Sequence, residues 1–317
     1  MDNEFLLMDR IQKIQQVIGK YGEENFYLSF SGGRDSTVLS TLLDMAIPGN
    51  KIPRVYSNTG IEYQLILDFV EKMKNQDHSW ELIIIKPNVP IKQMLEKEGY
   101  PFKSKIHAHC VNLFQIGSDN KMVLGYIGKR PETWHTNTCP KKLEYQFTDM
   151  NKLKISDMCC VKMKEEPMIN YSKSTGRSIA IIGIMREEGG RRGKSDCMVM
   201  RGSKLSRFQP LVPVTKEWED WFIDKYNVEI SDIYKPPYNL KRTGCKGCPF
   251  ALHLQDELDT IQRFFPNEYK QCEAIWKPVY DEYRRLGYRL RKDDGQMRLT
   301  DMFEREGYND SRFTGKD

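Results

Sequence analysis

The sequence lacks any long hydrophobic run. None of the apolar stretches among its 317 residues approaches the length of about 20 residues that spans a bilayer. Residues 1–4 also lack the basic-then-apolar order with which a secretory signal peptide begins. We therefore expect a cytoplasmic protein that does not enter a membrane. Internal repeats and low-complexity tracts are missing too, so a solenoid or a linker-like chain is not expected.

Eight cysteines are present, but a cytoplasmic location argues against a disulfide framework, because the cytosol keeps thiols reduced. Cys159 and Cys160 are adjacent, and Cys245 and Cys248 form a C-x-x-C pair. Four thiolates in two close pairs can ligate zinc or an iron–sulfur cluster. Adjacent cysteines are unusual in a zinc ribbon, which uses two C-x-x-C pairs. Zinc stays the second interpretation, and free buried cysteines are the third.

The pattern of apolar residues predicts an α/β protein with a doubly wound, mostly parallel sheet. Strands are expected at residues 26–30, 52–57, 80–86 and 178–185, and helices at residues 5–19, 36–47, 63–73 and 89–98. Strands that alternate with helices favour right-handed crossovers, which bring the loops after the strands to one edge of the sheet. Ser31, Asn58, Lys86 and Arg186 all follow expected strands, so their loops should converge at that edge.

Two regions depart from this alternation. Residues 100–155 contain scattered Gly and Pro with mixed patterning, which predicts an inserted subdomain over the sheet edge. Helices are expected at 216–226, 255–264 and 273–286, with a kink or interruption at Pro278. We therefore divide the chain into a nucleotide-binding α/β domain at 1–210, with the insertion, and a helical C-terminal region at 211–317 that completes the cysteine site.

The segment SFSGGRDS at residues 29–36 stands between an expected strand and an expected helix. Its glycines allow close approach of a ligand to the backbone, and the N–H groups at a helix start attract phosphate. Ser31 and Ser36 add hydroxyl donors, and Asp35 can hold a cation beside the phosphates. The Gly-Lys-Ser/Thr ending of a Walker A loop is absent. The alternative is an ordinary Gly-Gly turn with Asp35 as a helix cap.

These motifs together resemble one family. SGGRDS resembles the pyrophosphate loop of the ATP pyrophosphatases, and the Cys-Cys and C-x-x-C pairs resemble the 4Fe-4S signature of assimilatory adenylyl-sulfate reductases. GIMREEGGRR at residues 183–192 is similar to the arginine motif that accompanies both. The chain from about residue 26 to 272 is therefore identified as a member of the phosphoadenosine phosphosulfate reductase-like proteins, in the adenine nucleotide alpha-hydrolase superfamily.

Three departures from the family pattern concern the reaction. The sulfonucleotide reductases use a mobile C-terminal cysteine, whereas no cysteine follows Cys272 in this sequence. Met185 stands where the family motif has its first arginine, and Gly189 replaces a serine. The chain is closer in outline to phage and mobile-element members and to the ATP-dependent sulfurtransferases of DNA phosphorothioation. We therefore expect adenylylation of an acceptor, followed by sulfur transfer.

The resemblance implies ATP, Mg²⁺ and a 4Fe-4S cluster as ligands. It implies that nucleotide is bound by Ser29, Ser31, Gly32, Gly33, Asp35, Ser36, Asn58, Thr59 and Gly60. Asp35, Arg186 and Arg192 would be the catalytic residues, and the cluster would be held by Cys159, Cys160, Cys245 and Cys248. The arginines have ion pairs with Glu187 or Glu188 as their alternative role.

The net charge of +5 is uneven, since residues 177–207 hold eight Lys or Arg against three acids. This excess predicts an anion-binding face, with a solvated surface as the alternative. The expected partners are an adenine nucleotide, a nucleic-acid substrate and a sulfur donor such as a cysteine desulfurase, and a homodimer stays open. A sulfite-forming reductase and a non-catalytic nucleotide- or nucleic-acid-binding component are the other functions that fit.

Overall fold

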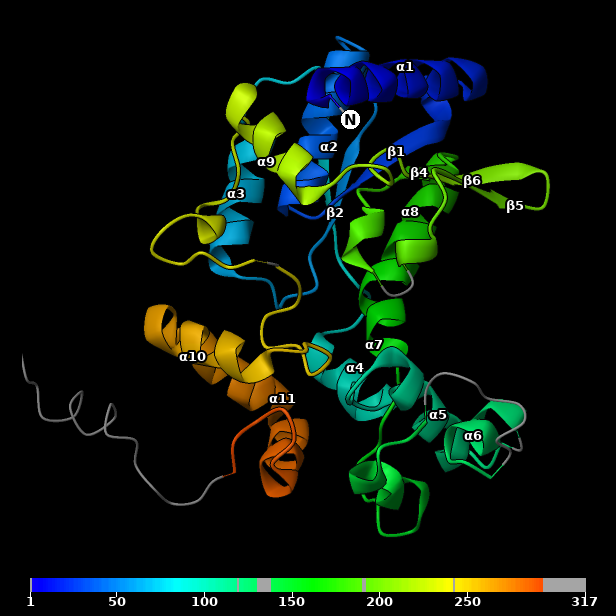
Figure 1. The fold of residues 1–317 in the computed structure, drawn as a ribbon, viewed down its shortest axis with the longest axis vertical. Helices are drawn as coiled ribbons and strands as arrows, with labels where there is room; N and C mark the ends of the chain where they lie inside the picture. The colour runs from blue at the N-terminus through cyan, green and yellow to red at the C-terminus, as the bar shows by residue number, and fades with distance from the viewer. Residues whose placement is uncertain (1, 119, 130–137, 190–191, 242, 293–317) are drawn as a thin grey trace, which may run out of the picture.

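The structure is a computed structural model that describes residues 2–118, 120–129, 138–189, 192–241 and 243–292. A six-stranded sheet has the order β3-β2-β1-β4-β6-β5 (Figure 1). Its strands are β1 (Phe26–Phe30), β2 (Arg54–Ser57), β3 (Leu82–Ile85), β4 (Ile179–Ile181), β5 (Met198–Arg201) and β6 (Lys204–Phe208). All neighbouring pairs are parallel except β5 and β6, which form an antiparallel hairpin. The expected mostly parallel α/β sheet is thus confirmed.

Helices cover both faces of this sheet, which agrees with the continuous apolar runs of β3 and β4. In Figure 1, α1 (Asn3–Tyr21), α2 (Arg34–Ala46), α3 (Gln64–Lys74) and α9 (Lys216–Lys225) gather on one side. The other face carries α8 (Glu166–Thr175), where Tyr171 packs edge-on against Tyr27 of β1. A separate small core of Tyr27, Val55 and Ala180 lies under α8.

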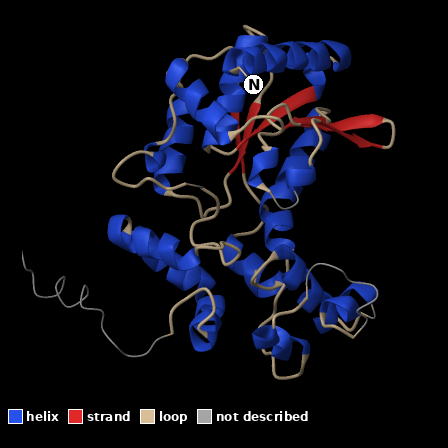
Figure 2. Cartoon of the chain, in the orientation of Figure 1, coloured by secondary structure: helices blue, strands red, loops and turns tan. Residues whose placement is uncertain are grey.

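The remaining helices form a second group beside one end of the sheet (Figures 1 and 2). It contains α4 (Ile91–Glu98), α5 (Lys105–Gln115), α6 (Lys121–Tyr126), α7 (Met158–Cys160), α10 (Leu254–Phe264) and α11 (Pro266–Leu286). A π-helical turn, η4 (Val161–Glu165), continues α7 into α8. Short turns complete the chain: η1 (Glu23–Asn25), η3 (Lys141–Phe147), η5 (Arg186–Glu188), η6 (Arg192–Lys194) and η7 (Asp232–Tyr234). No described helix is long and apolar enough to cross a membrane.

Several predicted elements differ from the observed ones. The strand expected at 178–185 is confined to Ile179–Ile181, because the chain turns away at Gly183 toward the arginine motif. The last helix begins at Pro266 and runs through Pro278 without interruption. Buried Trp276, Val279 and Tyr280 flank this proline, so packing on both sides offsets the lost backbone hydrogen bond. The β5–β6 hairpin was not expected from the sequence.

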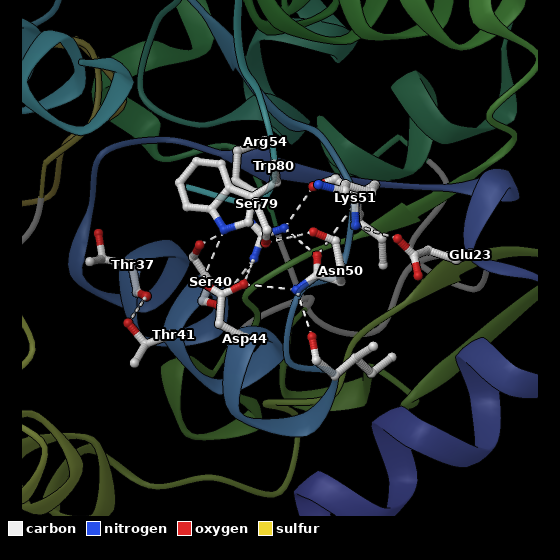
Figure 3. Close-up of polar contacts among 12 residues, drawn as sticks. Glu23, Thr37, Ser40, Thr41, Asp44, Asn50, Lys51, Arg54, Ser79 and Trp80 are labelled. Carbon is white, nitrogen blue, oxygen red and sulfur yellow. Dashed lines mark hydrogen bonds and ion pairs between the residues drawn. The ribbon is translucent and has the colours of Figure 1, made fainter. Parts of the chain in front are cut away.

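A fully buried arginine ties the sheet to α2 (Figure 3). The five N–H donors of Arg54 make five hydrogen bonds, to the side chains of Ser40, Asn50 and Asp44 and to the carbonyls of Ser40 and Ile52. Its guanidinium also lies 4.3 Å from the ring of Trp80, whose indole N–H donates to Asp44. Burial lowers the pKa of Arg54 to about 10, while Asp44 acts to raise it.

We predict that Arg54→Met lowers the free energy of unfolding by about 3 kcal/mol, because removing one partner leaves buried polar groups without their donor. Urea denaturation followed by circular dichroism measures the change. Arg263→Met is the control, because Arg263 is exposed and its guanidinium lies over the ring of Phe264. It should stay within about 0.5 kcal/mol of the parent protein. An equal loss in both variants would contradict the assigned role of Arg54.

Candidate functional site

The loop between β1 and α2 has the geometry of an anion-binding turn. The backbone of Gly33 is extended and caps α2, and the Ser36 hydroxyl donates to its carbonyl oxygen over 2.9 Å. The Ser31 N–H donates to Ser36 Oγ (3.1 Å), and the two serine hydroxyls lie 3.0 Å apart. Ser31 is exposed and Ser29 half-buried. The predicted pyrophosphate-loop residues are thus brought together at the start of a helix.

Glycine is required in this loop by close packing. Gly32 has a φ of +69°, and a Cβ there would lie 3.0 Å from the methyl groups of Ile66 and Val70. A Cβ on Gly33 would meet the hydroxyls of Ser31, Tyr234 and Thr243 at 3.1 to 3.5 Å. Tyr234 and Thr243 also hydrogen-bond to each other. These two residues border the loop from a distant part of the chain, and no sequence pattern singled them out.

The carboxylate of Asp35 has an unexpected neighbour in α9. Glu219 has a fully buried side chain, and burial together with the nearby Asp35 carboxylate raises the pKa of Glu219 to about 7. Arg34, from the same loop, forms ion pairs with Glu219 (3.4 Å) and Asp220. Glu219 lies outside every motif identified in the sequence.

The loop after β2 is organised by a single carboxylate. Thr59 donates to Glu62 from its hydroxyl (2.6 Å) and its N–H (3.1 Å), and Gly60 and Ile61 donate from their N–H groups (3.0 and 3.2 Å). Asn58 accepts from the Gly60 N–H over 2.9 Å. The predicted residues Asn58, Thr59 and Gly60 therefore belong to one compact turn at the same sheet edge as the first loop.

The loop after β4 carries the arginine motif. Gly183 packs against the first loop so closely that a Cβ would lie 3.0 Å from the Asp35 carbonyl oxygen. Met185 is buried, whereas Arg186 is exposed and donates to the carbonyl of Ser195 over 3.3 Å. The side chain of Arg192 lies outside the described residues. Glu187 accepts from the Lys216 N–H instead (2.6 Å), at the start of α9.

The two cysteine pairs come together. Cys159, Cys160, Cys245 and Cys248 line one small cavity, whose wall is completed by Pro101, Met163, Lys164, Phe250 and Trp276. α7 supplies the first pair, and the loop before α10 supplies the second. Within the described residues, no three His, Cys, Asp or Glu side chains form a group that could hold a metal ion.

The conformation of the C-x-x-C loop is fixed by a glycine and by contacts with α11. Gly247 has a φ of +60°, and a Cβ there would collide with the Tyr280 hydroxyl and lie 3.0 Å from Cys272 Sγ. The indole of Trp276 donates to the Lys246 carbonyl (3.1 Å), and buried Lys246 pairs with Glu268 (2.9 Å). The loop is therefore held in a conformation that only glycine permits at this position.

The pKa values of the thiols in this cavity and of Lys164 are shifted by burial and by one another. Burial raises the pKa of Cys159, Cys245 and Cys248. The neighbouring Cys245 is the largest cause of a raised pKa at Lys164, while burial opposes it. A cation that faces several sulfur atoms favours their thiolate form, which is the form that binds metals.

The cysteine loop and the β2 loop touch each other. The Lys246 N–H donates to the Ile61 carbonyl over 2.9 Å, and the Thr59 hydroxyl lies 4.0 Å from Cys245 Sγ. The sheet edge that carries these turns and the cavity lined by the four thiols therefore adjoin each other.

The sequence matches a known protein family. Residues 25–130 and 127–251 match the phosphoadenosine phosphosulfate reductase domain. The chain belongs to this family. The match includes the pyrophosphate loop, the β2 loop, the arginine motif and both cysteine pairs. No curated protein matches the sequence closely enough to count as a relative.

Several solved structures are similar to this family member. Phosphoadenylyl-sulfate reductase from Candida auris is 11% identical with a TM-score of 0.41, over 74% of this chain and 93% of that one. FMN adenylyltransferase from Candida glabrata is 13% identical with a TM-score of 0.45, over 77% and 62%. The U34-tRNA thiolase of Methanococcus maripaludis, solved with its [4Fe-4S] cluster, is 16% identical with a TM-score of 0.38, over 92% and 82%.

We predict that Gly183→Ala weakens binding of inorganic pyrophosphate by about tenfold or more. A Cβ would press on the Asp35 carbonyl and displace the start of α2, and each bond to a charged group is worth about 1.5–3 kcal/mol. Isothermal titration calorimetry measures the affinity. Gly19→Ala is the control, since a Cβ at this exposed position of α1 meets nothing within 4 Å. Unchanged affinity in Gly183→Ala would contradict the assigned packing.

Proposed function

We propose that this protein is an ATP-dependent adenylylating enzyme, a sulfurtransferase with a 4Fe-4S cluster, that acts on a nucleic-acid or nucleotide-like acceptor. The observation that carries the proposal is the junction of the two loops. The turn that would bind nucleotide contacts the loop that bears Cys245 and Cys248 through the Lys246–Ile61 hydrogen bond. Chemistry at a nucleotide and chemistry at sulfur would therefore take place in one site.

The proposed reaction has two steps. An oxygen of the acceptor attacks the α-phosphorus of ATP, the bond to the β-phosphate breaks, and pyrophosphate leaves. Sulfur at the oxidation level of sulfide then attacks the acceptor atom that bears the adenylylated oxygen, and AMP leaves with that oxygen. A cysteine desulfurase is the donor class that we favour, together with a reductant that brings its sulfur to the sulfide level.

The loop residues would hold the departing pyrophosphate. The N-terminus of α2 presents N–H groups and a positive dipole end, and Ser31 and Ser36 present hydroxyl groups beside them. Asp35 would hold Mg²⁺, whose charge offsets that of the phosphates. The fit is supported by the fully buried carboxylate of Glu219, whose pKa is raised by burial and by the nearby Asp35 carboxylate, so that negative charge gathers beside this loop.

The arginine motif would contribute positive charge at the α-phosphate or the acceptor. Arg186 is exposed beside this edge, and its present partner is a carbonyl oxygen rather than a carboxylate. An arginine fork suits phosphate oxygens, so this side chain can exchange a weak partner for an anion. We assign the same role to Arg192 from the motif alone.

We assign a cluster rather than a single zinc ion to the four cysteines, which line one cavity, because one of the two pairs consists of adjacent residues and a zinc ribbon uses two C-x-x-C pairs. The apolar side chains of Pro101, Phe250 and Trp276 would shield the cluster from water. When bound, the cluster would supply either an iron site for sulfide or structural and electrostatic support.

Reduction of a sulfonucleotide is the second candidate, because the family name describes that reaction. The family mechanism needs a thiol that attacks the sulfate and then meets a reductant. Cys272, the last cysteine of the sequence, is fully buried in α11, and burial raises its pKa to about 12. Met185 is buried where the family has an arginine. Both observations count against the reductase mechanism, and we therefore favour the transferase.

The basic residues of 177–207 support a polyanionic acceptor only in part. Arg186 and Lys194 are exposed in the loop after β4, at the nucleotide edge. Arg201 and Lys204 are exposed at the tip of the β5–β6 hairpin, which projects from the body in Figure 1. Because β6 runs parallel to β4, this tip lies toward the opposite edge of the sheet. A long nucleic acid could contact both.

We predict that protein purified without oxygen is brown and contains about four irons and four sulfides per chain, as a Cys-ligated 4Fe-4S site requires. Each of the changes Cys159→Ser, Cys160→Ser, Cys245→Ser and Cys248→Ser should abolish the absorbance and the iron content. Cys197→Ser is the matched control, because Cys197 lies outside the cavity, and it should keep the cluster. Colourless protein with one zinc per chain would reject the cluster.

We also predict that the cluster-loaded protein releases no sulfite from adenylyl sulfate or its 3′-phosphorylated form when thioredoxin or glutaredoxin is supplied. The reason is the burial of Cys272 and Met185. AMP and pyrophosphate should form from ATP when the acceptor is present, as measured by chromatography of labelled ATP. Sulfite formation at about one per second or faster would restore the reductase assignment.

A further inference from the structure

The insertion at residues 100–155 carries an excess of positive charge. Its described residues include two acids, Glu144 and Asp149, and eight lysines: Lys103, Lys105, Lys121, Lys129, Lys141, Lys142, Lys152 and Lys154. None of these lysines forms an ion pair with a described carboxylate, whereas Lys216 and Lys277 of other helices do. The insertion therefore presents positive charge that the described acids leave unpaired.

A cavity of about 540 Å³, which we call the insertion cavity, lies between this basic segment and α11. The insertion contributes Tyr145, Met150, Asn151, Lys152 and Leu153, and α11 contributes Pro278, Glu282, Arg285 and Leu286. None of these residues lines the cysteine cavity or belongs to the nucleotide loops. The insertion cavity is therefore separate from the site described above.

The one acid of the insertion cavity is held by its neighbours. Glu282 accepts two hydrogen bonds from Arg285, from Nε (2.7 Å) and from the terminal nitrogen (2.8 Å), and a third from the Tyr145 hydroxyl. The Arg285 side chain is 59% exposed, against 19% for Glu282, and its guanidinium lies 5.4 Å from the centre of the Tyr145 ring. The groups that face the solvent here are thus a cation and an aromatic ring.

Two lysines border the same ring. Tyr145 belongs to the 3-10 helix η3, in which residues three apart share a side, so exposed Lys142 lies on the side of Tyr145. Exposed Lys152 lines the cavity itself. Proteins bind single-stranded nucleic acid with positive side chains that follow the phosphates and aromatic rings on which bases stack. The insertion cavity combines both features.

We propose that the insertion cavity binds an unpaired base of a single-stranded nucleic acid, with the adjoining phosphates on Lys142 and Lys152. Its volume is in the range that encloses a small organic ligand. A base inside a duplex is stacked and cannot enter, which is why a single strand is the fitting partner. The proposal rests on the proposed function only in taking this strand to be the acceptor.

Two other polyanions fit the insertion cavity less well. An acidic peptide would pair with the lysines, but a carboxylate inserted into the cavity would meet the like charge of Glu282. A nucleobase is uncharged and offers both donors and acceptors, so it can lie beside Glu282 and the Asn151 amide. An anionic membrane is flat and would reach the lysines without filling the cavity.

The position of the insertion cavity relates it to the cysteines. The insertion is closed at its stem by hydrogen bonds between Tyr100 and Lys154 (2.8 Å) and between Ser156 and Tyr100 (3.0 Å). On α11, Pro278 lines the insertion cavity, and Trp276, two residues earlier, lines the cysteine cavity. The two cavities therefore lie on opposite sides of one helix, whose diameter is about 10 Å. A strand held by the lysines could pass from one cavity to the other.

The test measures strand binding without ATP. Short fluorescein-labelled oligouridine and oligothymidine of equal length are titrated with the full chain at several salt concentrations and followed by anisotropy, and binding of either strand supports the proposal. We expect the double variant Lys142→Gln with Lys152→Gln to weaken binding about tenfold. It should also lower the slope of log affinity against log salt by about 1.4, since each phosphate contact of a single strand contributes about 0.7.

Two variants of one residue separate stacking from charge. Tyr145→Leu removes the ring and should weaken binding about fivefold or more with an unchanged salt slope. Tyr145→Phe keeps the ring and loses only the bond to Glu282, so its affinity should stay within about threefold of the parent. Thermal denaturation checks that each variant is folded, and the lysine double variant tests the cavity if Tyr145→Leu is not.

The charge control is Lys20→Gln with Lys51→Gln. These exposed lysines precede β1 and β2, at the sheet edge opposite the nucleotide loops, and the double variant makes the same change in net charge. It should keep strand affinity within about threefold. An equal loss in this control, or in Arg201→Gln with Lys204→Gln of the β5–β6 hairpin, overturns the proposal.

Other results would also contradict the proposal. Duplex DNA that binds as tightly as the single strand, with no effect of Tyr145→Leu, would show attraction by charge alone. Polyglutamate or phosphatidylserine vesicles that bind through Lys142 and Lys152, when neither oligonucleotide binds, would identify a different partner.

The outcomes separate the insertion cavity from the proposed function. If the strand binds as expected but AMP and pyrophosphate never form from ATP, the cavity stands and the proposed reaction fails. If AMP and pyrophosphate form with a nucleic-acid acceptor, but neither the lysine double variant nor Tyr145→Leu changes strand affinity, the reaction stands and the cavity proposal is wrong.

Discussion

The buried guanidinium of Arg54 is the interaction on which the arrangement of the site depends. It stands at the start of β2 and bonds to Ser40 and Asp44, which lie within α2. The opposite ends of these two elements are the functional ones: α2 begins at the pyrophosphate loop, and β2 ends at the turn of Thr59 and Gly60. One desolvated charge thus ties together two elements whose other ends carry the two loops that we propose to act on the same nucleotide.

The carboxylate of Glu62 links the sheet to the loop that bears the cysteines. Glu62 accepts from three successive N–H groups and so closes the β2 turn. The same turn offers the Ile61 carbonyl to the N–H of Lys246. Because a buried backbone bond is costly to leave unmade, the cysteine loop and the nucleotide edge are expected to order together. The physical link between them is short and mostly backbone.

The sequence predicted the mostly parallel sheet, the glycine turn at the start of α2 and the cysteine pairs that line one cavity, because each is encoded locally by apolar periodicity, glycine or close spacing. The binding role of the turn stays a prediction. It did not predict Glu219, Tyr234 or Thr243. These residues reach the first loop from elements far away in the chain, and nothing in their own neighbourhood marks them. The β5–β6 hairpin was missed because its tip, Arg201 to Lys204, is charged and exposed and carries only a weak alternation. Division of the chain at residue 210 stays a prediction.

The four cysteines that we propose as cluster ligands are largely buried, and this burial affects how they would bind a metal. Thiols whose pKa is raised by burial resist ionisation, yet metal binding requires thiolates, so the binding energy must offset that cost. That energy would be used to hold α7 against the C-x-x-C loop, and through Lys246 to hold the β2 turn. Removal of the cluster would then disturb nucleotide binding even if its iron took no part in the reaction. Loss of activity together with the metal would therefore not by itself separate a structural cluster from a catalytic one, because both would hold the β2 turn.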